Sequence, residues 1–390
     1  MRGRRWRALA AALLVLAACT SNQEPMVDDV SPAPQVGASS TISPQPSATL
    51  ASGEALPAGC DRRAPAAAQT VAFVADGRAW ALDPDRERLT CLFKVDRPGP
   101  FAWGPQGDRV LLGGLEVRGV TDEAPALPGV DAQPSAFDWG HPIGLAVVFA
   151  QPEDRRPEKR FLDDGHIERL PQLPGGTYLD VAYHPSGLAL AFVIDRGGEQ
   201  SIWLSTNEGA DPVRLVFSKG GTRFTSIAFT PDGDRLVWTA QHAADYPQIH
   251  SMDLADRTGF ADGWRGEIGQ RASNLHVAPS GRLMAIDEGS GCEDREAMFV
   301  LSPRVVRPAL PDASGPTTVV GWLDRSTLLV GVGGCDEPLD LTAVDAAGRT
   351  TPLVLGAQVA GARTVTTSAP DSVPAPPAQV EEEPPPGGVG

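Results

Sequence analysis

Val181-Ala-Tyr-His-Pro-Ser-Gly-Leu188 and Ile227-Ala-Phe-Thr-Pro-Asp-Gly-Asp234 are two copies of one phrase, and further copies run over 101–108 and 275–282. In each copy a short apolar run ends in a Pro-x-Gly turn, because proline presets a negative φ and glycine accepts a positive one. The glycines of the last three copies are 46 and 48 residues apart. This period matches the roughly 40–50 residues of a propeller blade. The chain is therefore predicted to be an all-β array of similar sheet units.

Each unit is expected to be a four-stranded antiparallel meander. In one unit the strands are predicted over 181–183, 188–194, 201–204 and 213–217. The segment 71–93 has the pattern of a unit that lacks its first strand, and 362–367 near the C-terminus can supply that strand, which would close the ring and remove open sheet edges. Counting weaker copies around Trp139 and Trp322 favours a β-propeller of seven blades over 68–367. Six blades, with the first unit as an appendage, is the alternative.

The phrase aromatic-x-Pro-[Asp/Ser]-Gly, followed by an apolar strand and then Ile-x-x-x-Asp, resembles the TolB-type, WD-like β-propeller family. The best-known member of that family is a periplasmic partner of envelope proteins, and similar propellers are gating domains of peptidases. The resemblance specifies a blade better than an activity, because blades are scaffolds. The chain has no Gly-x-Ser-x-Gly motif, and we expect no room for a hydrolase domain beside the blades, so a propeller-gated peptidase is not expected.

The N-terminus has the pattern of an export signal. Basic residues precede an apolar run over 8–18 that is too short to span a bilayer. The run ends in Leu16-Ala-Ala-Cys19, which resembles the lipobox of bacterial lipoproteins and implies acylation of Cys19. An ordinary signal peptide is the alternative, and the pair Arg4-Arg5 leaves Sec or twin-arginine export open. We expect a signal peptide over 1–18, a disordered tether over 19–59, the propeller over 60–367 and a disordered Pro/Glu-rich tail over 368–390.

Charge and cysteine content limit the partners and the compartment. The net charge is −16, and without the four arginines of the signal it becomes −20. An acidic chain without a basic cluster is not expected to bind nucleic acid, or anionic lipid other than through an acyl anchor. Four cysteines besides Cys19 should pair outside the cytoplasm. Of three possible connectivities we favour Cys60 with Cys91 and Cys292 with Cys335, because the repeat makes their segments neighbours.

Equivalent positions on successive inner strands should form rings around the central axis. The candidate ligand-binding residues at such positions are Asp138, Asp180, Ser226, Asn274 and His276. They would hold a small ligand, a cation or a peptide end near a channel mouth; alternatively, they satisfy backbone groups of neighbouring strands.

We expect a monomeric scaffold, lipid-anchored on the outer face of the membrane, that binds an envelope protein or a peptide without catalysis, cofactor or metal. The alternative is a lactonase-like enzyme in which Asp138, Asp180, Asn274 and His276 hold a divalent metal.

Overall fold

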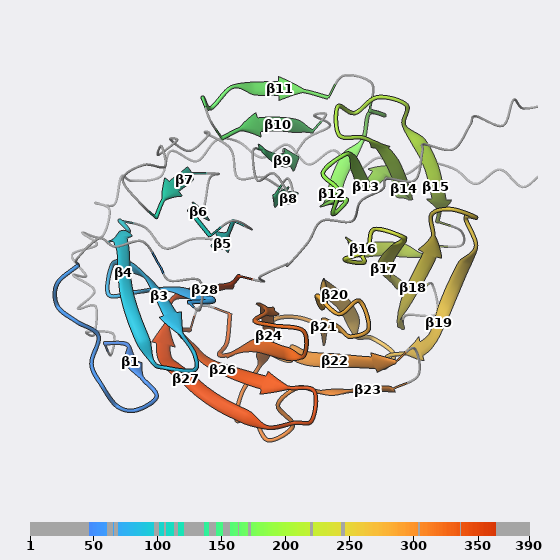
Figure 1. The fold of residues 1–390 in the computed structure, drawn as a ribbon. Helices are drawn as coiled ribbons and strands as arrows, with labels where there is room; N and C mark the ends of the chain where they lie inside the picture. Colours follow the sequence, from blue (N-terminus) through green and yellow to red (C-terminus); the bar gives the residue numbers. More distant parts are fainter. Residues whose placement is uncertain are drawn as a thin grey trace, which may run out of the picture. The chain divides into compact units, whose positions relative to one another are not determined.

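The fold consists of β-strands arranged in seven antiparallel sheets. The computed structural model describes residues 47–60, 65, 69–96, 101–104, 107–112, 116–120, 136–139, 146–150, 157–162, 164–170, 173–218, 221–242, 246–302, 305–335 and 337–363. Within these ranges no helix occurs, and hence none that could cross a membrane. The sheets lie around a common centre with one strand of each sheet innermost (Figure 1). The predicted seven-bladed β-propeller is confirmed.

In blades 1 to 4 the sheet runs outward from one innermost strand, which is the first strand named for each blade. Blade 1 consists of β28 (Val359–Ala362), β2 (Val71–Ala75), β3 (Arg78–Asp83) and β4 (Arg88–Lys94). Blade 2 consists of β5 (Ala102–Trp103), β6 (Arg109–Leu112) and β7 (Glu116–Gly119). Blade 3 consists of β8 (Ala136–Trp139), β9 (Ala146–Ala150), β10 (Glu158–Phe161) and β11 (Ile167–Arg169). Blade 4 consists of β12 (Thr177–Tyr183), β13 (Ala189–Arg196), β14 (Glu199–Thr206) and β15 (Val213–Phe217).

The remaining three blades have the same order. Blade 5 consists of β16 (Arg223–Phe229), β17 (Arg235–Gln241), β18 (Pro247–Asp253) and β19 (Gly259–Arg265). Blade 6 consists of β20 (Arg271–Val277), β21 (Met284–Gly289), β22 (Glu296–Ser302) and β23 (Val305–Pro308). Blade 7 consists of β24 (Thr317–Trp322), β25 (Thr327–Val332), β26 (Leu339–Asp345), β27 (Thr350–Ala357) and β1 (Thr49–Leu50). Four strands per blade is thus the rule, with three described in blade 2 and five in blade 7.

The ring closes within blade 1, where the C-terminal β28 pairs antiparallel with β2. The sequence correctly predicts that a C-terminal segment supplies the missing inner strand, but it places that strand at 362–367, whereas β28 covers Val359–Ala362. The small side chains of this strand gave a weak apolar pattern. They are needed for packing, since a Cβ at Gly361 would lie 3.0 Å from the Phe101 ring.

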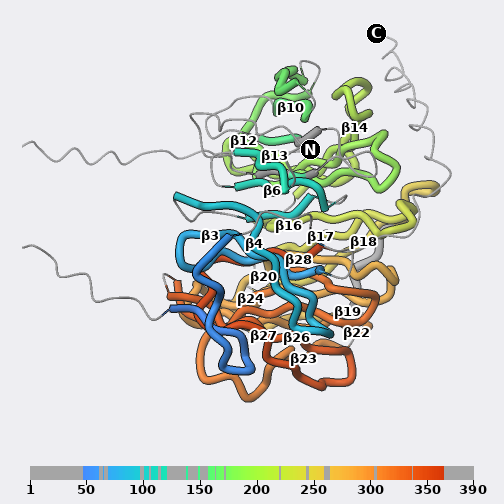
Figure 2. The backbone as a smooth tube through the Cα atoms, turned by 60° about the vertical axis from the view of Figure 1, so that its left-hand side comes forward, coloured from blue at the N-terminus to red at the C-terminus, as the bar shows by residue number. Residues whose placement is uncertain are grey.

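The propeller begins before residue 60. Residues 47–59, expected to belong to the tether, include β1, which pairs with β27 at the outer edge of blade 7 (Figures 1 and 2). Ala48 and Leu50 are buried there at 2% and 3% exposure. The tether boundary was therefore placed too late, because two apolar residues in a Ser/Pro/Ala-rich segment carry little periodic signal. The predicted signal, most of the tether and the tail at 368–390 lie outside the described residues.

The hydrophobic core is divided into layers between adjacent blades. Tyr178 and Phe192 of blade 4 pack edge to face with ring centroids 5.5 Å apart and share a cluster with Val148 of blade 3. The tryptophans of four blades are buried to 5% exposure or less: Trp80, Trp103, Trp238 and Trp322. This packing brings the inner strands together around one channel.

Candidate functional site

A central channel of about 920 Å³ runs between the inner strands and is lined by residues of all seven blades. The five residues that the sequence placed near this axis all line it: Asp138, Asp180, Ser226, Asn274 and His276. The repeat therefore identified the right positions. Their hydrogen bonds decide what these side chains can do.

Three of the five side chains act as hydrogen-bond acceptors for the next blade. Each accepts a hydrogen bond from a backbone N–H of the neighbouring inner strand. The bonds join Tyr183 N–H to Asp138 Oδ2 at 2.7 Å, Ile227 N–H to Asp180 Oδ2 at 2.7 Å, and Leu275 N–H to Ser226 Oγ at 3.2 Å. A buried N–H needs such an acceptor. These residues therefore link successive blades, as the second interpretation of the sequence expected.

A β-bulge in the inner strands of blades 4 and 5 explains why the side chains of Asp180 and Ser226 reach across. The pairing register shifts between Tyr178 and Asp180 in blade 4 and between Phe224 and Ser226 in blade 5. An extra residue on one strand re-aims the following side chain and strengthens the twist. In blade 6 the shift lies between Ser273 and His276, and Asn274 has a φ of +52°, a conformation that asparagine tolerates better than most residues.

Blade 6 uses a carboxylate that the sequence pattern did not reveal. Asp287 on β21 accepts the Val319 N–H of blade 7 at 2.7 Å. Asn274 donates through Nδ2 to Asp287 Oδ2 at 3.0 Å and to the Val319 carbonyl at 2.7 Å. Blade 6 carries Asn274 at the position where the preceding blades carry Asp or Ser. This difference was the available signal that the acceptor for the next blade's N–H lies on another strand.

His276 completes this network as a neutral donor. Its Nε2 lies 2.9 Å from Asn274 Oδ1, and since the Asn274 amide nitrogen already donates twice, the imidazole donates to the oxygen. Burial lowers the pKa of His276 to about 4. The imidazole is thus uncharged at neutral pH and positions Asn274.

Asp180 is ionised only above about pH 6. Burial raises its pKa from 3.8 to about 6, opposed by hydrogen bonds from the Ile227 and Val181 backbone and from the Ser226 side chain. One carboxylate oxygen faces the Val181 N–H at 2.9 Å and the other the Ile227 N–H. This carboxylate is therefore engaged in the interblade link.

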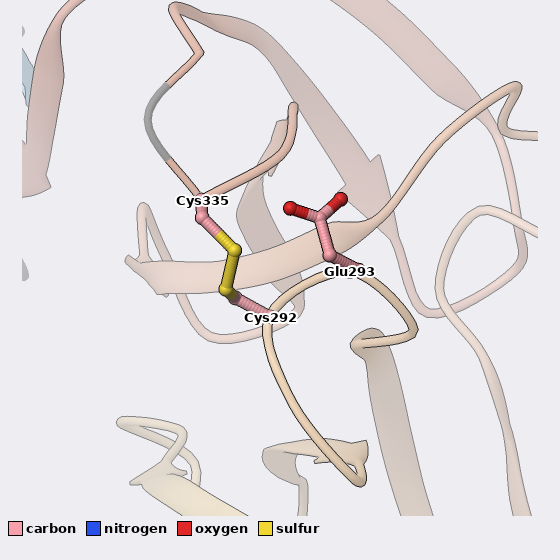
Figure 3. Close-up of side chains that lie close together, drawn as sticks. All are labelled: Cys292, Glu293 and Cys335. Carbon is pink, nitrogen blue, oxygen red and sulfur yellow. A yellow bond between two sulfur atoms is a disulfide. The ribbon is translucent and has the colours of Figure 1, made fainter.

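The channel residues do not fit a lactonase-like metal site. Such a site needs several oxygen or nitrogen ligands converging on one ion, whereas Asp138 and Asp180 each point at a backbone N–H of the next blade. Among the described residues a single group of three potential ligands occurs, Cys292, Glu293 and Cys335 (Figure 3). Its two sulfurs form a disulfide, so Glu293 alone could act as a ligand there.

The same disulfide braces one mouth of the channel. Cys292 lies in the loop between β21 and β22, and Cys335 in the loop between β25 and β26. The carboxylates of Glu293 and Glu337 both approach Gly334, within 3.5 Å and 3.2 Å of the position that a Cβ there would take. Both predicted pairs are present, since Cys60 is bonded to Cys91. Disulfides are typical of an oxidising compartment outside the cytoplasm.

A second hollow of about 380 Å³ opens beside this mouth. Arg295 lines both the channel and the second hollow, which also contacts Leu179, Phe224 and Arg271. The Nε of Arg295 is buried without a hydrogen-bond partner and lies 3.9 Å from Asp287. The mouth thus offers a cavity at the junction of blades 4 to 6 with polar atoms at its rim.

The opposite end of the propeller carries the Pro-x-Gly turns, which pack on one another. His184 Nε2 lies 3.0 Å from the Gly233 carbonyl of the next blade, and Gly281 of blade 6 packs against Pro231. His184 is 1% exposed, and burial lowers its pKa. This histidine is packed and stabilises the turn end.

The chain resembles solved β-propellers at low sequence identity. No protein-family model and no curated protein matches it. A prolyl endopeptidase is 13% identical over 75% of this chain and 49% of that chain (TM-score 0.54), and a puromycin-hydrolyzing peptidase of Mycobacterium tuberculosis is 13% identical over 75% and 55% (TM-score 0.52). TolB of Acinetobacter baumannii is 13% identical over 76% and 66% (TM-score 0.46). The chain thus spans about half the length of the two peptidases, and at these identities the likeness shows the fold alone.

Proposed function

We propose that this chain is a non-catalytic binding scaffold of the cell envelope, which holds an extended segment of a partner protein at the disulfide-braced channel mouth. The observation that carries the proposal is the pre-formed channel of about 920 Å³. Concave, largely pre-formed hollows of this size are where proteins bind ligands and chain segments. The ring side chains are already bonded to the next blade, which leaves shape and rim contacts as the means of recognition.

The rim supports binding at this end rather than at the turn end. The disulfide holds two loops of adjacent blades together, so a partner would meet a surface that needs little ordering on binding. Exposed Glu293 and Glu337 provide charged contacts at the edge. At the turn end, by contrast, successive turns pack on one another through His184 and Gly233.

The place of action that we propose is the outer face of the cell membrane. The basic start, the apolar run and Leu16-Ala-Ala-Cys19 support an acyl anchor on Cys19, and the two disulfides support an oxidising compartment. Replacement of Cys19 by serine should move the protein from the membrane fraction to the soluble extracytoplasmic fraction. Retention of the Cys19→Ser variant in washed membranes would contradict the anchor.

Site-specific photo-crosslinking tests the binding face. A photoreactive amino acid at Glu337 in the membrane-bound full chain should give a discrete adduct, identified by mass spectrometry. The matched control carries the same group at Asp232, which is also exposed but lies on the turn between β16 and β17 at the other end. Equal adducts from both positions, or none from Glu337, would contradict the proposal.

A further inference from the structure

Two histidines face each other on the hairpin of β17 and β18 in blade 5. His250 on β18 pairs with Trp238 on β17, and the His242 N–H bonds the Tyr246 carbonyl just beyond the end of β17. Side chains two apart on a strand share a face, so His242 and His250 lie diagonally on one face with Ala240 between them. The small alanine leaves room, and the two Nε2 atoms are 3.4 Å apart.

Aromatic neighbours fix both imidazole rings. His250 stacks on Trp238 with centroids 5.5 Å apart and an interplanar angle of 7°. His242 stacks on Tyr246 at 5.0 Å and 22°. Rotamers held by packing present their polar atoms in a defined geometry before any ligand arrives. Both histidines are half-buried, so solvent can reach the space between them.

The two nitrogens lie at the separation expected of two ligands of one metal ion. At 3.4 Å they form a long hydrogen bond, since N–H donors usually lie about 2.9–3.0 Å from an oxygen acceptor. Two imidazole nitrogens on one tetrahedral Zn²⁺, each about 2.0–2.1 Å from the ion, are about 3.3–3.4 Å apart. The rings therefore stand at the separation of two ligands of a single ion.

We propose that His242 and His250 form a two-histidine site for a divalent transition-metal ion, Zn²⁺ or Cu²⁺, whose remaining coordination positions are filled by water. Imidazole nitrogen suits these ions, whereas Mg²⁺ and Ca²⁺ prefer oxygen. The site is independent of the partner-binding function proposed above. It lies on the hairpin of β17 and β18, and neither histidine is among the residues that line the channel.

The charges around His242 and His250 affect the affinity of the site for a metal cation. Burial, and secondarily the charge of His242, lowers the pKa of His250 to about 4, so this imidazole is neutral and free to ligate at pH 7. The Arg265 guanidinium lies 5.0 Å from the centre of the Tyr246 ring and disfavours a cation. The net charge of −16 acts in the opposite direction by attracting cations to the protein.

Calorimetric titration of the full chain with Zn²⁺, and separately with Cu²⁺, tests the site. A Cys19→Ser background removes the one cysteine outside the disulfides. One ion should bind per chain, and His242→Gln or His250→Phe should each weaken binding at least tenfold. Phenylalanine preserves the stack on Trp238, and unchanged thermal unfolding shows that the variants fold. Exposed His166, replaced by glutamine, is the matched control and should leave the affinity unchanged.

Two results would overturn the proposal. One is the absence of saturable binding of either ion to the parent chain. The other is an affinity of the His250→Phe variant equal to that of the parent.

Discussion

Replacing Asp180 by asparagine tests whether this channel-lining carboxylate links blades 4 and 5 at an electrostatic cost. The substitution preserves the shape of the side chain and removes its proton exchange. Asp180 has a pKa of about 6 in the folded chain, against 3.8 as the ordinary value, because burial outweighs its hydrogen bonds. Between pH 4 and 6 the folded chain therefore holds a proton that the unfolded chain has released.

The sign and size of the effect follow from this difference. A carboxyl group with a raised folded-state pKa contributes most to stability at low pH, and that contribution is lost as the pH rises towards 6. Integrated from pH 4 to pH 7, a shift from 3.8 to about 6 amounts to about 2 kcal/mol. The free energy of unfolding of the parent minus that of Asp180→Asn should thus be about 2 kcal/mol greater at pH 4 than at pH 7.

Urea unfolding of both proteins at the two pH values measures this quantity. His250 and His276, whose pKa values are lowered to about 4, change stability with pH in the opposite direction. Both are present in parent and variant and cancel in the difference. Asp211→Asn is the control, since Asp211 is exposed and has a φ of +49° that asparagine accepts. An equal difference at both pH values, or a larger one at pH 7, would refute the reasoning.

Three further predictions concern the frame of the propeller. Ser226→Ala leaves the Leu275 N–H without its acceptor and should lower the free energy of unfolding, measured in urea, by about 1–3 kcal/mol. An unchanged free energy of unfolding would mean that this link is dispensable. The double substitution Cys292→Ser and Cys335→Ser opens a loop of 43 residues and should lower the free energy of unfolding by about 4 kcal/mol in the chain-entropy estimate. It should also abolish the Glu337 crosslink. A stable variant with an intact crosslink would show that the disulfide is unnecessary for binding. Truncation after Gln358 removes β28 and exposes β2, whose five residues are all buried, so size-exclusion chromatography should show aggregates. Truncation after Arg363 is the control and should give the parent's profile. A monomeric, cooperatively unfolding protein without β28 would contradict the role of ring closure.

The repeated phrase predicted the blades because its turn and its second apolar strand are local features. The inner strands are longer than the phrase suggests, and β12 begins at Thr177 rather than Val181. The bulge before Asp180 breaks the alternation of apolar and polar residues, so the first half of the strand has no period-2 signal. Local patterns therefore located each strand but not its start.

The candidate site was predictable only in part, for a related reason. Equivalent positions on successive blades could be aligned, which placed Asp180 and Ser226 at the channel correctly. Asp287 lies on a second strand and reaches the ring through Asn274, and His242 meets His250 diagonally across a hairpin. Neither contact follows from sequence spacing, because each depends on the register between strands.

The position of β1 has a mechanical consequence. Because this short strand lies at the outer edge of blade 7, the described part of the chain begins at the circumference of the propeller and not at its axis. A force applied to the N-terminal side of the chain acts first on the two residue pairs between β1 and β27. It acts next on the covalent link from Cys60 to Cys91 on β4. The disulfide carries the force past residues 61–90, so the seam between β2 and β28 is spared the tension.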